Sequence, residues 1–392
     1  MKNVVLLSCV VATTIFLLAG CASPSSSKPQ PSLTGSRTTH VGDWNASKNS
    51  AKQGVQISQQ KPTGLSSIHM VSPTRGWATG NGTVWYTTDG AKTWKNVTPK
   101  EISPSSKLQT YSYSLGKNHF WLAVTTNTQT AVQIYRTSNS GQTWNMTQIH
   151  DVGYPMYLSF TDMNHGWISM MQGAAAGSER ESIYQTNNGG KTWNKISYTN
   201  EIPGGTLPFG GDKTGANFVN TQHGWATGFS PASGQVYLFQ TRDDGHTWKS
   251  QIVPVPSSLQ KFQFTSHPPI FFDQQDGILP VQVNAIPAGF MVYQTTNGGK
   301  TWEPNTPLMG ITRNAVFSTW DFVTPNLGFV TDDAKLFMTD NGGQAWIIIQ
   351  PNISLQGVIE LDFITQTDGW ALTTSGSLYH TTDGGYKWTK VH

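Results

Sequence analysis

Short runs of alternating apolar and polar residues, rich in aromatic and β-branched side chains, recur along most of the chain. Two examples are Val84-Trp85-Tyr86 and Ser377-Leu378-Tyr379. Runs of this kind, bounded by turn-forming residues, predict β-strands. Between them lie clusters of Gly, Asp, Asn and Thr, which favour tight turns. The pattern therefore predicts an all-β protein of many short antiparallel strands.

One turn sequence recurs seven times, and its period indicates the architecture. The octapeptide Thr-x-Asp/Asn-x-Gly-x-Thr-Trp, with small departures, ends at tryptophans spaced 50, 49, 55, 54, 44 and 42 residues apart. A period of this length predicts propeller blades or solenoid turns. At the third position, a short polar side chain can accept bonds from backbone N–H groups ahead of it and hold a hairpin turn. The residues there are Asp89, Asn139, Asn188, Asp243, Asn297, Asn341 and Asp383.

A second repeat, x-Gly-Trp, lies in register with the first. Each unit then reads as strand a, a Gly-Trp turn, strand b, a variable loop, strand c, the octapeptide and strand d. Four strands in each of seven units predict a single seven-bladed β-propeller of four-stranded antiparallel blades over residues 62–392. A solenoid is the alternative, although solenoids usually carry distinct capping repeats and the terminal copies here look like the others. We expect every octapeptide tryptophan to be buried.

The start of the chain predicts export. Residues 1–20 read as a signal peptide, with Lys2 as the charged start and an apolar stretch after it. Leu18-Ala19-Gly20-Cys21 resembles a bacterial lipobox, in which Cys21 becomes the lipidated first residue; a cleaved, unlipidated signal is the alternative. Residues 21–61 then form the lipidated cysteine and a flexible Ser/Pro-rich tether. We expect an extracytoplasmic protein anchored by lipid to a bacterial cell membrane.

The paired octapeptide and Gly-Trp motifs resemble the BNR, or Asp-box, repeat β-propeller superfamily. With the lipoprotein signal, the chain most resembles its photosystem II stability and assembly factor-like (WD40/YVTN/BNR-like) branch. The resemblance covers about residues 62–392. It implies a non-catalytic scaffold that binds a protein partner and helps to assemble or stabilise an envelope complex. Asp-box repeats also occur in sialidases, xyloglucan hydrolases and sorting receptors, so a glycoside hydrolase or a glycan-binding protein is the alternative.

Composition excludes several classes of function. Charged residues make up 12% of the chain, about half the usual share, and the formal net charge is +3 without a basic cluster, so nucleic acid is not an expected partner. The only cysteine besides Cys21 is Cys9 in the signal, which leaves no disulfide, thiol nucleophile or cysteine-ligated metal in the exported chain. No pair of histidines has metal-ligand spacing. We expect a monomer without a metal or other cofactor.

Titratable residues give one candidate constellation near the ring centre. His69, Asp321 and Asp362 each stand eight residues before the Gly-Trp aromatic, on the predicted innermost strands of adjacent blades. They either hydrogen-bond across blade interfaces or form a channel-mouth cluster for a cation or polar ligand. The two aspartates are also the only pair worth testing for inverting hydrolysis. Only Arg180 and Arg313 lie outside the repeats and the tether, whereas sialidases of this superfamily use three arginines, so we expect no sialidase activity.

The two faces of the predicted ring differ. The octapeptide turns and the Gly-Trp turns both lie on one face, and connectors of varying length lie on the other. The longest connectors span 173–181, 203–213, 254–267 and 283–289. Variable loops on a rigid scaffold usually carry function. Apolar and polar residues in these connectors predict a partner-binding surface, with drifted surface loops as the alternative. The candidate binding residues are Glu179, Arg180, Glu181, Phe209, Asp212 and Lys213.

Overall fold

The computed structural model describes residues 61–125, 130–175, 178–199 and 205–392. The predicted signal peptide, Cys21 and almost all of the predicted tether fall outside these ranges. Within them, strands and tight turns make up nearly the whole structure, and the one helix is a single 3-10 turn, η1 (Ser257–Leu259). This part of the chain contains no helix with the length and apolar character needed to cross a membrane.

Five sheets are antiparallel, four-stranded and follow chain order. Their strands are β1 (Ser67–Met70), β2 (Gly76–Gly80), β3 (Thr83–Thr87) and β4 (Lys95–Asn96); β5 (Thr110–Leu115), β6 (His119–Thr125), β7 (Val132–Thr137) and β8 (Asn145–Ile149); β9 (Tyr154–Phe160), β10 (Gly166–Ala175), β11 (Ser178–Thr186) and β12 (Asn194–Tyr198); β23 (Thr319–Phe322), β24 (Gly328–Thr331), β25 (Leu336–Thr339) and β26 (Ile347–Ile349); β27 (Val358–Phe363), β28 (Gly369–Thr373), β29 (Leu378–Thr381) and β30 (Thr389–Lys390).

The sixth sheet has ten strands. They are β13 (Asp212–Phe218), β14 (Gly224–Ser230), β15 (Tyr237–Thr241), β16 (Lys249–Ser250), β17 (Gln263–Ser266), β18 (Ile270–Phe271), β19 (Gly277–Asn284), β20 (Gly289–Thr295), β21 (Glu303–Pro304) and β22 (Leu308–Met309). The sheet is this wide because β17 pairs with both β14 and β19. The connector 254–267, expected to be a loop, thus supplies η1 and a strand.

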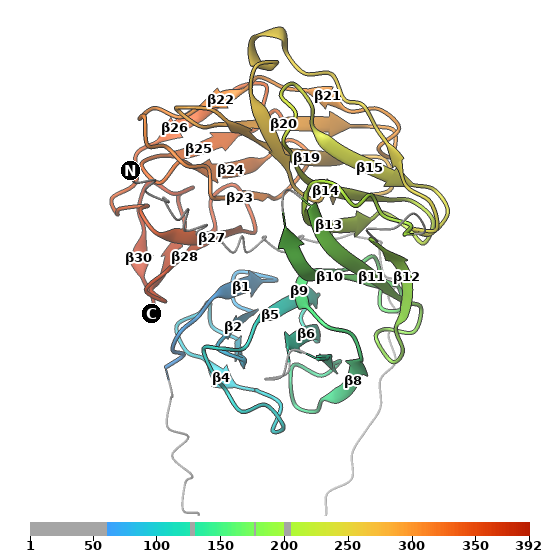
Figure 1. Cartoon of the computed structure of the whole chain (residues 1–392). Coiled ribbons are helices and arrows are strands. Elements are labelled where there is room, and N and C mark those ends of the chain that lie inside the picture. Colours follow the sequence, from blue (N-terminus) through green and yellow to red (C-terminus); the bar gives the residue numbers. More distant parts are fainter. Residues whose placement is uncertain (1–60, 126–129, 176–177, 200–204) are drawn as a thin grey trace, which may run out of the picture.

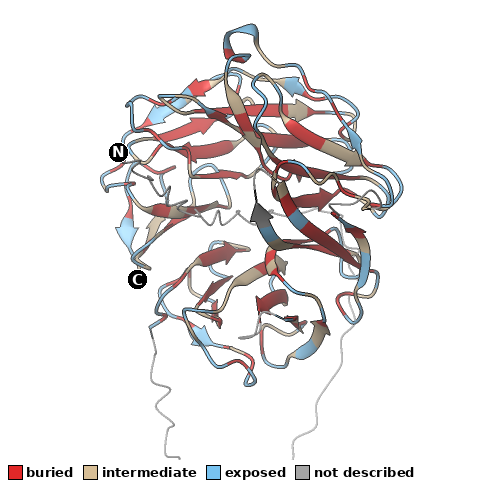
Figure 2. Ribbon diagram, viewed as in Figure 1, coloured by how far each residue is buried: buried red, intermediate tan, exposed pale blue. Residues whose placement is uncertain are grey.

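The sheets follow one another around a ring, and the chain colours advance from blue through green and yellow to red before meeting blue again (Figure 1). The last sheet packs on the first, since the Met70 N–H of β1 donates to the Asp362 carboxyl of β27 at 2.5 Å. His392 also reaches the first described residues, since its ring lies 2.5 Å from the Pro62 carbonyl. Buried residues fill the strands, and exposed residues gather at the turns (Figure 2). The ring is therefore closed by side-chain and backbone contacts between its first and last sheets.

The octapeptide turns share one hydrogen-bond pattern. In each copy the threonine hydroxyl donates to the Asp or Asn side chain two residues later at 2.9–3.0 Å. The same hydroxyl accepts the N–H of the fifth residue at 2.8–3.1 Å. The Asp or Asn oxygen then accepts the N–H of the seventh residue at 2.8–3.0 Å. These bonds hold the turn from within, and in each copy the N–H of the fourth residue also donates to a carbonyl of the adjacent Gly-Trp turn at 2.8–3.1 Å.

Aromatic stacking joins neighbouring sheets. Trp167 of β10 stacks on Phe218 of β13 with ring centroids 4.7 Å apart and planes 6° apart, and Trp248 meets Phe218 edge-on from the octapeptide of that sheet. Three octapeptide tryptophans are buried, whereas the expectation that all seven are buried is wrong. Edge-on packing does not separate the buried indoles from the half-buried ones, because Trp302 and Trp388 are also edge-on and are buried. The half-buried ones are Trp144, Trp193, Trp248 and Trp346.

Candidate functional site

The predicted partner-binding loops at 173–181 and 203–213 are largely strands. β10 and β11 pair as far as Ala175 and Ser178, which converts most of the first range into a hairpin. The described part of the second range lies along this hairpin through a parallel bridge between Ser178 and Gly211. The expectation of two exposed loops is wrong here, because backbone pairing makes them one packed unit.

Three of the six candidate binding residues are buried. Glu179, Glu181 and Lys213 are only 2%, 0% and 4% exposed, so they do not form the exposed polar rim that the sequence predicted. The two glutamates lie two residues apart on one face of β11, and the Lys213 N–H donates to Glu179 Oε2 at 2.6 Å. The other candidates are exposed or half-buried: Arg180, Phe209 and Asp212.

Lys213 fastens the second segment to the hairpin. Its ammonium donates to the carbonyl of Glu179 at 3.1 Å and to those of Phe209, Gly210 and Gly211 at 2.9, 3.3 and 3.2 Å. Burial lowers the pKa of this lysine. Burial and the neighbouring Glu181 raise the pKa of Glu179 to about 8, and burial raises that of Glu181 to about 7.

A groove of about 370 Å³ opens beside this packed unit. Its walls come from the segment before β13, the turn after β14 and the strand β15. Glycine and proline leave backbone groups accessible along it, while two aromatic rings supply apolar surface. The residues that define it include Pro208, Gly210, Gly211, Pro231, Tyr237 and Phe239.

Exposed apolar side chains lie on the face of the ring that carries the groove, which is the face of the long connectors. Ile286, in the β19–β20 connector, is 76% exposed, and it lies next to cis-Pro287. The β20–β22 pairing brings Met309 opposite Gly289, so the chain after β22 runs beside this connector. We call the following residues the connector-face apolar patch: Ile286, Met309, Ile311 and Val316.

Asp321 and Asp362 both hydrogen-bond across sheet interfaces. Asp321 Oδ2 accepts the Phe363 N–H at 2.5 Å, and Asp362 Oδ2 accepts the Met70 N–H at the same distance. The structure therefore brings the two aspartates to adjacent inner strands. One oxygen of each carboxyl is thus engaged with a backbone donor of the neighbouring sheet.

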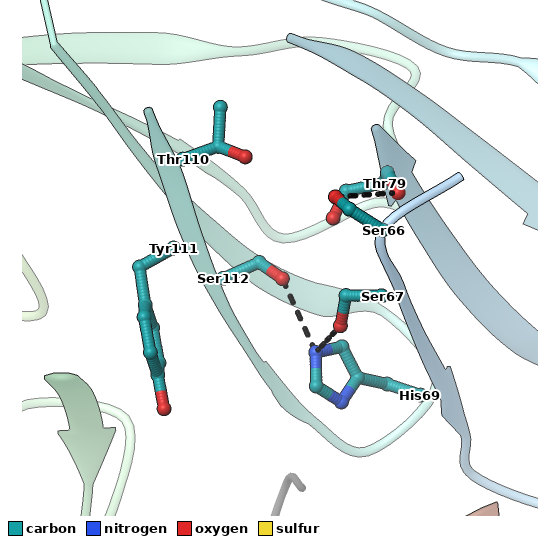
Figure 3. Close-up of a pocket in the computed structure, with 7 residues that line it drawn as sticks. All are labelled: Ser66, Ser67, His69, Thr79, Thr110, Tyr111 and Ser112. Carbon is teal, nitrogen blue, oxygen red and sulfur yellow. Dashed lines mark hydrogen bonds between the residues drawn. The ribbon is translucent and has the colours of Figure 1, made fainter. Parts of the chain in front are cut away.

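His69 lies in the neighbouring inner interface, and Figure 3 shows its ring pointing toward two serines. Its Nε2 is 3.1 Å from the hydroxyls of both Ser67 and Ser112. The cavity that these residues line is about 10 Å³, room for about one water molecule. The Ser67 hydroxyl also donates to Glu360 Oε1 at 3.2 Å, and the Ile68 N–H donates to Glu360 Oε2 at 2.6 Å.

Glu360 is a member of this cluster that was not predicted from the sequence. It lies two residues before Asp362 on β27, and the two-residue period of a strand would have placed both side chains on one face. Burial raises the pKa of Asp321 to about 7. Burial, followed by neighbouring carboxyls, raises the pKa of Glu360 and of Asp362 well above their usual values. Burial lowers the pKa of His69 to about 4, so no cation offsets these acids.

No known family model and no curated protein sequence matches the chain. Solved structures do match it. YCF48 bound to a D1 peptide has a TM-score of 0.53 and 16% identity, over 82% of this chain and 93% of that one. YCF48 from Cyanidioschyzon merolae has a TM-score of 0.55 and 15% identity, over 83% and 98%.

A third match is the GH74 enzyme of Niastella koreensis, with a TM-score of 0.56 and 15% identity over 83% of this chain. The present chain spans 53% of that enzyme. The chain has a β-propeller fold. This confirms the prediction of a propeller with four-stranded antiparallel sheets, and at these identities the likeness shows the fold alone.

Proposed function

We propose that this propeller is a non-catalytic, membrane-anchored, extracytoplasmic scaffold that binds a protein partner, similar to the photosystem II assembly factor-like branch of the Asp-box superfamily. The difference between its two faces carries the proposal. One face consists of short turns with internal hydrogen bonds. The other carries the groove and the connector-face apolar patch. Exposed apolar side chains gathered beside a groove are typical of a protein-binding surface.

The proposal includes a monomeric ring of seven blades. The ten-stranded sheet holds two four-stranded units, β13–β16 and β18–β21, which β17 joins by its insertion between β14 and β19. Together with five separate sheets this makes seven. The lipobox-like Leu18-Ala19-Gly20-Cys21 supports the anchor. The structure of YCF48 with a D1 peptide supports the idea that a propeller of this size presents a surface for a protein segment.

Two serine substitutions test the partner surface without disturbing buried residues. Ile286→Ser together with Ile311→Ser removes apolar contact area from exposed positions, whereas deleting 173–181 would also remove buried Glu179 and Glu181. We expect cross-linking in the native envelope to recover at least about tenfold less partner protein, as loss of an interface anchor produces. Met163→Ser, in the β9–β10 turn of the opposite face, is the control. Unchanged recovery with the double variant would contradict the proposal.

A glycoside hydrolase is the second candidate, favoured by the likeness to GH74 enzymes. Inverting hydrolysis needs two carboxyls about 6.5–9.5 Å apart with access to sugar and water. The engagement of Asp321 and Asp362 with backbone N–H groups supports a structural role instead. We expect no release of sugar from xyloglucan or an aryl glycoside. Turnover that disappears in both Asp321→Asn and Asp362→Asn would establish the hydrolase.

A further inference from the structure

Buried oxygen atoms without hydrogen-bond partners gather between the β10–β11 hairpin and the next sheet. Buried polar atoms almost always have partners in folded proteins, and three of these atoms belong to carboxyls. The five atoms are Glu179 Oε1, Glu181 Oε1, Glu181 Oε2, Ser169 Oγ and Tyr237 Oη. The Ser169 hydroxyl lies near enough to Glu181 to lower the pKa of that carboxyl, so Ser169 and Glu181 are each other's neighbours in the cluster. A group of this kind is too costly to bury unless something supplies positive charge or hydrogen bonds.

The side chains approach one another from three strands. Ser169 of β10 pairs with Ile183 of β11, so its hydroxyl shares a face with Glu181, its diagonal neighbour, and with Glu179. Tyr237 comes from β15 in the next sheet, and after burial the charges of Glu181 and Glu179 are what raise the pKa of its hydroxyl. Ser169 is 1% exposed and Tyr237 7%, so both hydroxyls are buried at the cluster.

Charge in this region is unbalanced. Glu179, Glu181 and the adjacent Asp212 carry three formal negative charges, and Lys213 and Arg180 carry two positive charges, which leaves one negative charge; of the two cations only Lys213 is buried. The Lys213 ammonium does not satisfy the unpartnered oxygens, because it donates to four backbone carbonyls.

We propose that these oxygens hold a hard cation, with Ca²⁺ the best match in charge. Carboxylate and hydroxyl oxygens without nitrogen or sulfur ligands suit hard cations. Mg²⁺ fits less well, since it demands octahedral geometry and keeps several waters. Among the described residues no group of three or more His, Cys, Asp or Glu side chains is arranged to hold a metal, so the proposed site depends on its two hydroxyls as well as its two carboxylates. We expect a dissociation constant for Ca²⁺ of about 10⁻⁴–10⁻³ M, the weak range of extracellular modules, because the site has few charged ligands.

The cation would join the hairpin to the adjoining sheet. Tyr237 contributes its hydroxyl to the cluster and its ring to the groove wall. Binding therefore couples the cation to the shape of the groove. Cation binding is tested on the isolated protein, so its outcome does not depend on whether a partner protein binds the groove.

The test is thermal unfolding of the full chain after chelation, at one pH and constant ionic strength. Added CaCl₂ is expected to raise Tm by about 3 °C or more, with saturation in the millimolar range. MgCl₂ should act much more weakly, and exchange of NaCl for a bulky organic salt shows whether Na⁺ uses the same site. No saturable shift with either Ca²⁺ or Na⁺ would overturn the proposal and leave protons and water as the partners.

Variants locate the site. Tyr237→Phe removes one ligand atom while keeping the ring, and Glu181→Gln removes a carboxylate at nearly constant volume. Both should shift the half-saturating Ca²⁺ concentration upward by about tenfold or more, and Tb³⁺ emission sensitised by Tyr237 should fall in parallel. Tyr293→Phe is the control, because that hydroxyl donates to the Pro254 carbonyl at 2.9 Å outside the cluster. An unchanged response in Tyr237→Phe, which keeps its core packing, would overturn the assignment even if Glu181→Gln did not fold.

Discussion

Replacing Trp225 with alanine is expected to lower the free energy of unfolding by about 3–5 kcal/mol, the range for large aromatic truncations in a core. Trp225 is 2% exposed and stacks on Phe271 with ring centroids 5.0 Å apart. Its indole N–H donates to Gln251 Oε1 at 2.8 Å. Truncation leaves both a cavity and an unpaired buried oxygen. Urea unfolding followed by tryptophan fluorescence measures the loss.

Trp248→Ala is the matched comparison. Trp248 is half-buried and meets Phe218 edge-on, so its removal exposes less core and should cost clearly less. Equal losses in the two variants would contradict the inference that stacked Gly-Trp tryptophans hold adjacent sheets together more strongly than half-buried octapeptide tryptophans do.

The second large effect is a loss of stability as the pH rises from about 5 to about 8. Burial raises the pKa of Asp321 from 3.8 to about 7, and burial followed by neighbouring carboxyls raises the pKa values of Glu360 and Asp362 well above their usual values. Between the unfolded and folded pKa values the folded state binds more protons, so the free energy of unfolding falls as pH rises. For Asp321 alone the loss between pH 5 and pH 8 is about 3 kcal/mol.

The charged and titratable groups near Asp321 do not reverse this fall in stability with rising pH. Asp321, Glu360 and Asp362 lie near one another, and the Ser67 hydroxyl links Glu360 to His69. Burial lowers the pKa of His69, so this ring supplies no compensating positive charge. At low pH a second effect lowers the free energy of unfolding as the pH falls. Hydrogen bonds from Thr247 and the Lys387 N–H lower the pKa values of exposed Asp243 and Asp383, and this stabilisation is lost as pH falls through those values. We expect maximal stability in weakly acidic solution.

Asp321→Asn tests this account. Asparagine resembles the protonated acid and can still accept the Phe363 N–H, so the variant should match the parent near pH 5 and be more stable than it near pH 8. Thermal melts across this pH range measure the difference. A variant with the parent's pH dependence would show that Asp321 is not the group responsible.

The sequence predicted the repeat architecture because each repeat solves its turn locally. The threonine, the Asp or Asn and the glycine of an octapeptide satisfy one another within eight residues, so a single copy already specifies a hairpin. The stacking of a Gly-Trp ring on the next sheet repeats with the same period. Fold class and strand order therefore follow from the printed sequence.

The candidate site depended on contacts that the period does not describe. Glu179 and Glu181 look like surface residues of an insertion, and only the bridge from Ser178 to Gly211 and the carbonyl contacts of Lys213 bury them. Strand β17 was missed for the same reason, because it forms where a long connector pairs with both β14 and β19. Ile286, by contrast, is exposed as the connector composition suggested.

The most direct test of partner binding is site-specific photo-cross-linking in the native envelope. A photoreactive residue at position 286, within the connector-face apolar patch, is compared with one at position 163 on the opposite face; both native side chains are exposed. The account predicts one discrete protein adduct from position 286 and none from position 163. An adduct from position 163 alone, or none from either position, would contradict it.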